Sequence, residues 1–257
     1  GTVRAKIIGE RRGINYFPGV EISATDSKSG KNIEILGYLC DSPDRLEGLC
    51  HRNVVTRKKA SQLMTLKIAR KYPISPELVL KCATGSTAVF EQHIMHALMQ
   101  CGYSMSIYGD VYNEIFCSES GEIYHELFSP ESEENVLVKV NYPEPAEVID
   151  AIHEAGGIAV LSHPGASDCL DILDDILSAG IDGVEVWHPE NDVEQEAKLL
   201  KFARANEILA IGGTDFKGMY SKKTVCIGDC STPDADVKAL MSYKTKMKKK
   251  KAATENK

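Results

Sequence analysis

Acidic and imidazole side chains recur in this sequence at the points where short apolar runs end. Glu21 follows FPGV, His163 follows IAVLS, Asp215 follows ILAIGGT, and Glu185 and His188 lie at the end of GVEVWH. Carboxylates and imidazoles without thiolates suit divalent cations such as Mn, Mg, Fe(II) or Zn. Two or three such ions would generate hydroxide and neutralise phosphate charge. Each residue alone is more often a loop cap than a ligand, so only the recurrence at several strand ends points to a metal site.

Alternating helices and strands are expected from about residue 145 onward. Pro145 suits a first helical turn, AEVIDAIHEA has apolar positions at helical spacing, and the apolar runs IAVLS, GVEVW and ILAIGG are separated by further helical segments at 168–179 and 193–206. Consecutive strand-helix units imply a parallel sheet, as an open sheet or a closed barrel. Parallel strands bring their carboxyl ends to one rim, so the acidic and imidazole residues should converge there.

Two more strands are expected near the N-terminus, in INYFPGVEIS and NIEILGYLCD. Between about residues 44 and 142 the pattern is helical, with no convincing strand. We therefore expect a discontinuous barrel domain at 1–43 and 143–243, a helical insertion or lid at 44–142, and a basic C-terminal tail at 244–257.

The composition is that of an ordinary globular protein, with 43% hydrophobic and 26% charged residues in a chain of 257. A net charge of -7 does not favour nonspecific DNA binding. The 8 cysteines are scattered without CxxC pairs, which is typical of reduced cytosolic thiols rather than of disulfides or a thiolate zinc site. No apolar run approaches the roughly 20 residues that span a bilayer, so a cytoplasmic protein with no membrane partner is expected.

Five segments carry a more specific signal: PGVEIS at 18–23, ILGY at 35–38, LSHPG at 161–165, GVEVWHPEN at 183–191 and GGTDFKG at 212–218. In this order and spacing they resemble the PHP family, named for polymerase and histidinol phosphatase. The helical insertion, with EQHIMHALMQCGY, is similar to the TrpH/YciV-type branch, whose members act on nucleotide 3',5'-bisphosphates and short RNA 5' ends. The resemblance implies an α/β fold, a distorted (β/α)7 barrel with an inserted helical subdomain, and two or three divalent metal ions.

Carried over by position, the resemblance makes Glu21 a bridging metal ligand and His163 and Asp215 further ligands, and these three would form the catalytic centre. Glu34 stands where the family commonly has a histidine, and a glutamate can still ligate a hard cation. Glu185 is at most a supporting residue, as is His188.

The same resemblance places His93 on the substrate phosphate, with Arg57 or Lys59 as a cationic partner from the preceding helix. An imidazole or guanidinium on a lid would clamp phosphoryl oxygens. The implied substrate is a small phosphorylated nucleotide or a short oligonucleotide.

Two departures from the family pattern leave alternatives open. The chain begins about where the family's Asp-His-Asp segment would end, so the first barrel strands are expected to be absent, and Lys217 replaces a histidine. A barrel with uncovered edges favours a homo-oligomer. A catalytically impaired module with a binding or regulatory role is one alternative function, and a phosphatase for a small metabolite such as histidinol phosphate is another.

Overall fold

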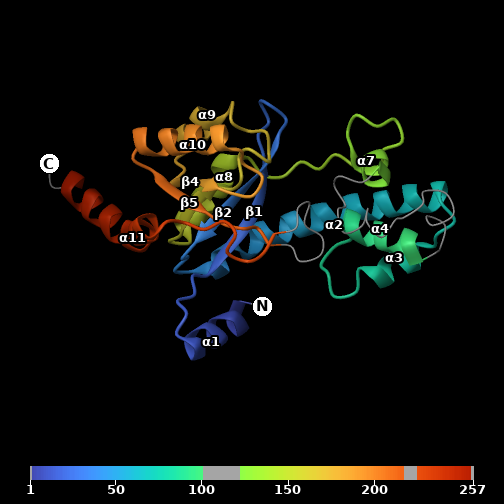
Figure 1. Ribbon diagram of the computed structural model, residues 1–257, viewed down its shortest axis with the longest axis horizontal. Coiled ribbons are helices and arrows are strands. Elements are labelled where there is room, and N and C mark those ends of the chain that lie inside the picture. The colour runs from blue at the N-terminus through green and yellow to red at the C-terminus, as the bar shows by residue number, and fades with distance from the viewer. Residues whose placement is uncertain (1, 101–121, 217–224, 256–257) are drawn as a thin grey trace. The chain divides into compact units, whose positions relative to one another are not determined.

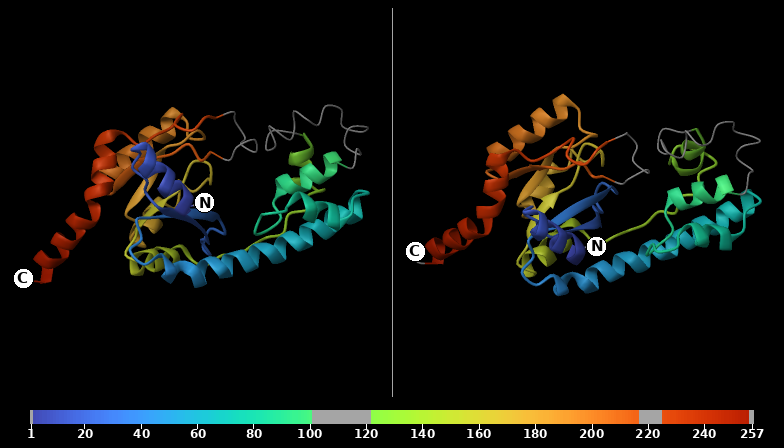
Figure 2. Two further views of the ribbon diagram at one scale, coloured as in Figure 1. Left: turned by 90° about the horizontal axis from the view of Figure 1, so that it is seen from below. Right: turned by 60° about the horizontal axis from the view of Figure 1, so that its bottom comes forward.

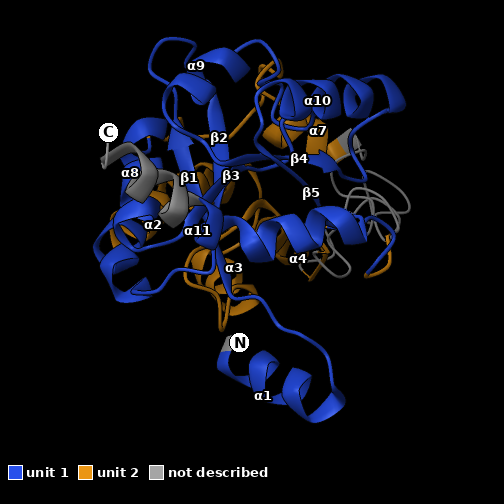
Figure 3. Ribbon diagram, turned by 90° about the vertical axis from the view of Figure 1, so that its left-hand side faces the viewer, with its two compact units in different colours: residues 1–50, 142–214, 228–257 blue, residues 51–141, 215–227 orange. Residues whose placement is uncertain are grey.

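The computed structural model describes residues 2–100, 122–216 and 225–255 of the chain (Figure 1). The chain divides into two compact units, drawn in different colours in Figure 3. Unit 1 comprises residues 1–50, 142–214 and 228–257, and unit 2 comprises residues 51–141 and 215–227.

Unit 1 is built on a five-stranded sheet of order β1-β2-β3-β4-β5. Its strands are β1 (Gly19–Thr25), β2 (Asn32–Tyr38), β3 (Ile158–Leu161), β4 (Gly183–Trp187) and β5 (Leu209–Gly212). The strands β3, β4 and β5 pair in parallel, as the alternating pattern predicted, whereas β2 is antiparallel to both of its neighbours. The prediction of an α/β fold is therefore confirmed with a mixed sheet, and closure into a (β/α)7 barrel stays a prediction.

The β1-β2 hairpin forms one edge of the sheet, and its turn is stabilised by local contacts. The side chain of Asp26 accepts a hydrogen bond from the Ser29 amide at 2.8 Å, and Gly30 adopts φ 74°. The hydrogen bond from Ser29 lowers the pKa of Asp26. This turn fixes the register, in which Ser23 pairs with Glu34.

Helices of unit 1 cover the sheet on both faces. One face carries the larger core, in which Ile22, Ile35 and Val184 pack with residues of three helices. These helices are α8 (Pro145–Glu154), α9 (Leu173–Ser178) and α10 (Val193–Ala205). On the opposite face, Val160 and Ile211 pack against Leu240 of α11 (Asp234–Glu255), which extends away from the sheet in Figure 2.

Helix boundaries follow local signals in most places. Asp192 and Gln195 form a reciprocal capping box at the start of α10. The expected helix at 168–179 is shorter in the structure, because α9 begins only at Leu173 and the preceding residues form turns. Unit 1 also contains α1 (Thr2–Arg12), the short 3-10 helix η1 (Pro43–Leu46) and the first residues of α2 (Glu47–Lys71).

Unit 2 is helical in its described residues. It contains the remainder of α2, together with α3 (Pro76–Cys82), α4 (Glu91–Gln100) and α7 (Glu122–Phe128). Ser75 caps α3 because its side chain accepts a hydrogen bond from the Leu78 amide. Unit 2 has a hydrophobic core of its own, which includes Ile68, Val79 and Ile94. No helix in the described part of either unit is long and apolar enough to cross a membrane.

Candidate metal centre

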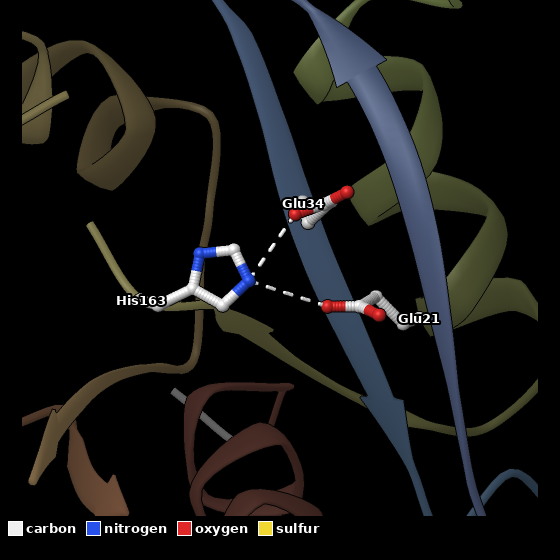
Figure 4. Close-up of side chains that lie close together, drawn as sticks. All are labelled: Glu21, Glu34 and His163. Atoms are coloured by element: carbon white, nitrogen blue, oxygen red, sulfur yellow. Dashed lines mark ion pairs between the residues drawn. The ribbon is translucent and has the colours of Figure 1, made fainter. Parts of the chain in front are cut away.

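Glu21, Glu34 and His163 gather on one face of the unit 1 sheet (Figure 4). The Nε2 atom of His163 lies 3.2 Å from Oε2 of Glu34 and 3.5 Å from Oε1 of Glu21. One ligand atom from each of the three residues lies within 4.8 Å of the others. The histidine side chain is only 9% exposed, whereas those of Glu21 and Glu34 are 44% and 34% exposed. The cluster therefore has a buried floor and a side open to solvent.

The strand register brings the two glutamates together. Ser23 pairs with Glu34, and Glu21 lies two residues from Ser23 on the same face, so the glutamates are diagonal neighbours across the hairpin. Their neighbours Ile22 and Ile35 point to the opposite face and are buried in the larger core. Alternation along the two strands thus leaves both carboxylates on the face away from that core.

His163 reaches the cluster from the end of β3. The amide of Ser162 donates to the carbonyl of Glu34 at 2.9 Å, which ties the end of β3 to β2. His163 itself adopts φ 23°, in the left-handed region that non-glycine residues seldom occupy. Its Nδ1 lies 3.1 Å from Oγ of Ser167, and this partner holds the ring with Nε2 toward the glutamates.

The geometry corrects the sequence-based reason for Glu21. It was expected at a strand end, yet it lies inside β1, and Glu34 lies inside β2. The carboxyl ends of parallel strands account for His163 after β3 and His188 after β4, but the glutamates come from an antiparallel hairpin.

Glu185 and His188 lie close to His163. Oε2 of Glu185 accepts from the His163 amide at 2.9 Å and from the Ser162 hydroxyl at 3.2 Å. The rings of His163 and His188 lie 5.2 Å apart between centroids. One of these contacts involves Ser162, whose hydroxyl also lies 3.5 Å from Oε1 of Glu21. Ser162 and Ser167 were not predicted from the sequence, although both lie within four residues of the predicted ligand His163.

The cluster attracts positive charge strongly. Burial alone would lower the pKa of His163, but hydrogen bonds to Glu21 and Glu34 and the charges of Glu34 and Glu185 outweigh it and raise the pKa to about 10. Burial also raises the pKa of Glu185 and of Tyr38, and the charges of Glu185 and Glu21 add to the effect on Tyr38. The imidazole is thus protonated at neutral pH, and a proton occupies the place between the two carboxylates.

A divalent cation fits the same place. The donor set is two carboxylates and one imidazole, which is suited to Mn, Fe(II), Zn or Mg. The backbone of His163 and its Nδ1 are already held, so Nε2 is the atom left to bind the ion. In this arrangement Glu21, Glu34 and His163 would hold the metal.

Metal binding should release the proton of His163. Because the pKa of His163 is raised to about 10, the ion must displace a proton at any pH below that value. We expect the apparent affinity for Mn²⁺ to rise about tenfold per pH unit between roughly pH 7 and pH 9, with about one proton released per ion. Calorimetry in buffers of different ionisation enthalpy measures that proton. A pH-independent affinity would contradict the assignment of His163.

The same shift stabilises the metal-free fold at low pH. The pKa of His163 is higher in the folded chain, at about 10, than the ordinary 6.5. Its contribution to stability is therefore fully present below about pH 6.5 and is lost as the pH rises through about 10.

The other predicted site residues lie in unit 2. Asp215 follows β5 and adopts φ 46°, and it is grouped with unit 2 rather than with the cluster. His93, Arg57 and Lys59 also belong to unit 2, so their position opposite the metal cluster stays a prediction. Lys217 lies outside the described residues.

Within unit 2, Arg57 and His93 both contact Phe90. The guanidinium of Arg57 lies over the Phe90 ring, 5.2 Å from its centroid, and the rings of Phe90 and His93 are in edge contact at 5.8 Å. Nδ1 of His93 accepts from the Phe90 amide at 3.0 Å. Burial and the neighbouring His96 lower the pKa of His93. His93 is therefore neutral near pH 7, with its proton on Nε2. The side chain of Lys59, on the same helix as Arg57, is exposed.

Comparison with known proteins gives several relatives, although no family model matches the chain. The chain is 28% identical to a phosphoribosyl 1,2-cyclic phosphate 1,2-diphosphodiesterase of Eggerthella lenta, over 86% of this chain and 80% of that protein. It is 25% identical to the 5'-3' exoribonuclease Rnm of Salmonella typhimurium, over 84% of this chain and 70% of that protein.

Two solved structures share the fold. A protein from Bifidobacterium adolescentis, described as a metal-dependent phosphoesterase, superposes with a TM-score of 0.74 at 25% identity, over 93% of this chain and 80% of that one. An amidohydrolase from Chromobacterium violaceum superposes with a TM-score of 0.69 at 19% identity, over 93% of this chain and 82% of that one.

Proposed function

We propose that this chain is a metal-dependent phosphoesterase of the PHP type, and that Glu21, Glu34 and His163 hold its metal. The resemblance to PHP-family phosphoesterases that the motifs predicted is confirmed by the relatives, which are a cyclic phosphate diphosphodiesterase and exoribonucleases. The observation that carries the proposal is the close group of two carboxylates and one buried imidazole on the sheet of unit 1.

The metal would supply Lewis-acid chemistry and an activated water at neutral pH. The chain's own residues do the remaining work. Glu21 and Glu34 offset the charge of the cations, and their partial exposure leaves room for a phosphate oxygen on the open side. Ser167 contacts Nδ1 of His163, and Glu185 accepts from its backbone amide. These two contacts orient the ring so that Nε2 faces the glutamates. Asp215, which follows β5, is proposed as a further ligand.

The proposed substrate is a phosphate ester of a nucleotide or the 5' end of a short RNA. The relatives' names give two specific alternatives, a phosphoribosyl 1,2-cyclic phosphate and an RNA degraded in the 5'-to-3' direction. Both contain a phosphodiester attached to a ribose, which is the shared chemistry. Manganese as the metal, a cytoplasmic location and a homo-oligomer stay predictions from the sequence.

His93 is proposed to donate a hydrogen bond to the substrate phosphate. Nδ1 accepts from the Phe90 amide, so Nε2 carries the proton that points outward from this contact. We expect His93→Ala to raise KM about tenfold, because a hydrogen bond to a charged group contributes about 1.5 kcal/mol. His93→Gln places its amide nitrogen near Nε2 and should retain more of the affinity. Steady-state kinetics on adenosine 3',5'-bisphosphate measures both variants.

Arg57→Ala should raise KM as well, because the guanidinium lies over the Phe90 ring that His93 also contacts. Lys59→Ala tests the alternative cation from the same helix. If KM is unchanged in the variants of His93, Arg57 and Lys59, these residues of unit 2 do not bind the substrate phosphate.

The function itself is tested by metal content and phosphate release. Purified chain is loaded with Mn²⁺, Fe²⁺, Zn²⁺ or Mg²⁺, and elemental analysis gives the stoichiometry. Hydrolysis is then measured as phosphate release from adenosine 3',5'-bisphosphate and histidinol phosphate, and by chromatography of the products from a 5'-phosphorylated trinucleotide and a phosphoribosyl 1,2-cyclic phosphate. Turnover that requires metal supports the proposal.

The outcomes separate the alternatives. Metal binding with no turnover on any substrate would favour a catalytically impaired binding or regulatory module, which the replacement of two family histidines by Glu34 and Lys217 also favours. Preference for histidinol phosphate would favour the small-metabolite phosphatase. Absence of both metal and turnover would overturn the proposed function.

A further inference from the structure

Glu185 is a buried carboxylate that the proposed chemistry does not use directly. The residue is 5% exposed and lies in the middle of β4, between Val184 and Val186, which point into the larger core. Its own side chain therefore lies on the same sheet face as Glu21 and Glu34. A buried carboxylate is costly unless hydrogen bonds compensate it, so its partners indicate why it is there.

Those partners belong to the segment that carries His163. Oε2 accepts from the backbone amide of His163 at 2.9 Å and from the hydroxyl of Ser162 at 3.2 Å. Both donors are in the two residues that follow β3, and neither is the imidazole itself. Glu185 thus acts on the backbone that presents the ring.

The backbone at this point is in an uncommon conformation. His163 has φ 23°, and a non-glycine residue in the left-handed region is strained and persists only where its surroundings fix it. The hydrogen bond from its amide to Glu185 is one contact that fixes it, and the Ser162 amide bond to Glu34 is another.

The other carboxylate oxygen lies next to Gly213. A Cβ atom at Gly213 would lie 3.1 Å from Oε1 of Glu185, so the glycine leaves the space that this oxygen occupies. The adjoining register shift between Glu185 and Trp187 brings Trp187 so close to Gly212 that a Cβ there would lie 2.6 Å from it. The glycine pair at the end of β5, Gly212 and Gly213, therefore accommodates both the irregular strand and the carboxylate.

We propose that Glu185 is the positioning residue of the metal centre: its carboxylate holds the backbone of Ser162 and His163 so that the imidazole meets Glu21 and Glu34. The inference rests on the proposed function, because it assigns a role toward the same metal. Among the described residues, the group able to hold an ion contains Glu21, Glu34 and His163 but not Glu185. Glu185 therefore acts through His163.

The test compares Glu185→Ala, Glu185→Gln and Ser162→Ala in the full chain. Affinity for Mn²⁺ is measured by calorimetry, and the visible absorption of bound Co²⁺ reports the geometry of the ion. We expect Glu185→Ala to weaken Mn²⁺ binding by about 10- to 100-fold, as for other residues that orient a metal ligand. Glu185→Gln keeps a carbonyl oxygen for both donors, so it should bind within about threefold of wild type.

Asp182→Ala is the matched control. Asp182 is a buried carboxylate directly before β4 that also accepts from a β3 amide, that of Ala159 at 2.8 Å, but its side-chain partners are His153 and Tyr243. Its loss should lower Tm without changing Mn²⁺ affinity or the Co²⁺ spectrum.

Each result decides the matter. Weak binding in Glu185→Ala with recovery in Glu185→Gln supports the positioning role. Unchanged affinity and Co²⁺ spectrum in Glu185→Ala, or a lower Tm alone as in Asp182→Ala, would overturn it. If Glu185→Ala does not fold, a Glu185→Gln variant that folds but loses binding as completely as a ligand variant would also overturn it. A wild-type chain that binds no metal defeats the proposed function itself, and this inference with it.

Discussion

We expect His163→Ala to lower metal-dependent phosphate release by roughly a thousandfold, because metal-ion catalysis supplies several kcal/mol and each 1.4 kcal/mol is about a factor of ten in rate. His163 provides the only nitrogen in the described metal group, and its Nε2 is the atom that faces both glutamates. Without it, two partly exposed carboxylates remain, which hold a borderline metal weakly. Phosphate release and bound metal should therefore fall together.

A second histidine of unit 1 provides the control. His153 also pairs with a carboxylate, since its Nε2 lies 2.8 Å from Oδ2 of Asp182. Asp182 retains the Ala159 amide and the Tyr243 hydroxyl when His153 is removed. We expect His153→Ala to reduce the free energy of unfolding by about 1 kcal/mol with unchanged activity. Equal loss of activity in both variants would show that the effect of His163→Ala is structural.

The sequence predicted the residues of the cluster better than the reason for their proximity. The structure places His163 after β3, as its position behind the buried run IAVLS indicated. The same rule failed for Glu21, which lies within β1. Only the register of the hairpin places Glu21 beside Glu34, and register depends on the pairing partner rather than on local composition.

Other parts of the centre could not be read from the sequence for a different reason. Ser162 and Ser167 look like ordinary loop residues, and their roles arise from the left-handed turn at His163. Glu185 was expected only as a supporting residue at a strand end, and its burial becomes apparent when β3 and β4 are paired. The antiparallel pairing of β2 with β3 was likewise not predicted, because the composition of an apolar run does not determine whether the strand pairs in parallel or antiparallel.

The double variant Glu21→Gln, Glu34→Gln should change the chemistry of His163 even without metal. Burial is the largest single influence on the pKa of His163 and acts to lower it, whereas the two glutamates contribute the hydrogen bonds that raise the pKa to about 10. Neutral amides cannot stabilise the protonated ring in the same way. We therefore expect the pKa of His163 to fall below its ordinary value of 6.5 in the double variant. NMR titration of the imidazole signals measures this shift.

The same double variant should bind Mn²⁺ at least roughly a thousandfold more weakly, since two charged oxygen ligands become neutral ones that a hard cation prefers less. Each single variant retains one carboxylate within 3.5 Å of Nε2, so the single losses should be smaller. Glu154→Gln neutralises an exposed carboxylate of α8 and should bind as wild type does. If the double variant keeps its metal while the pKa of His163 falls, the ion is held elsewhere, and the three residues form a proton site rather than a metal centre.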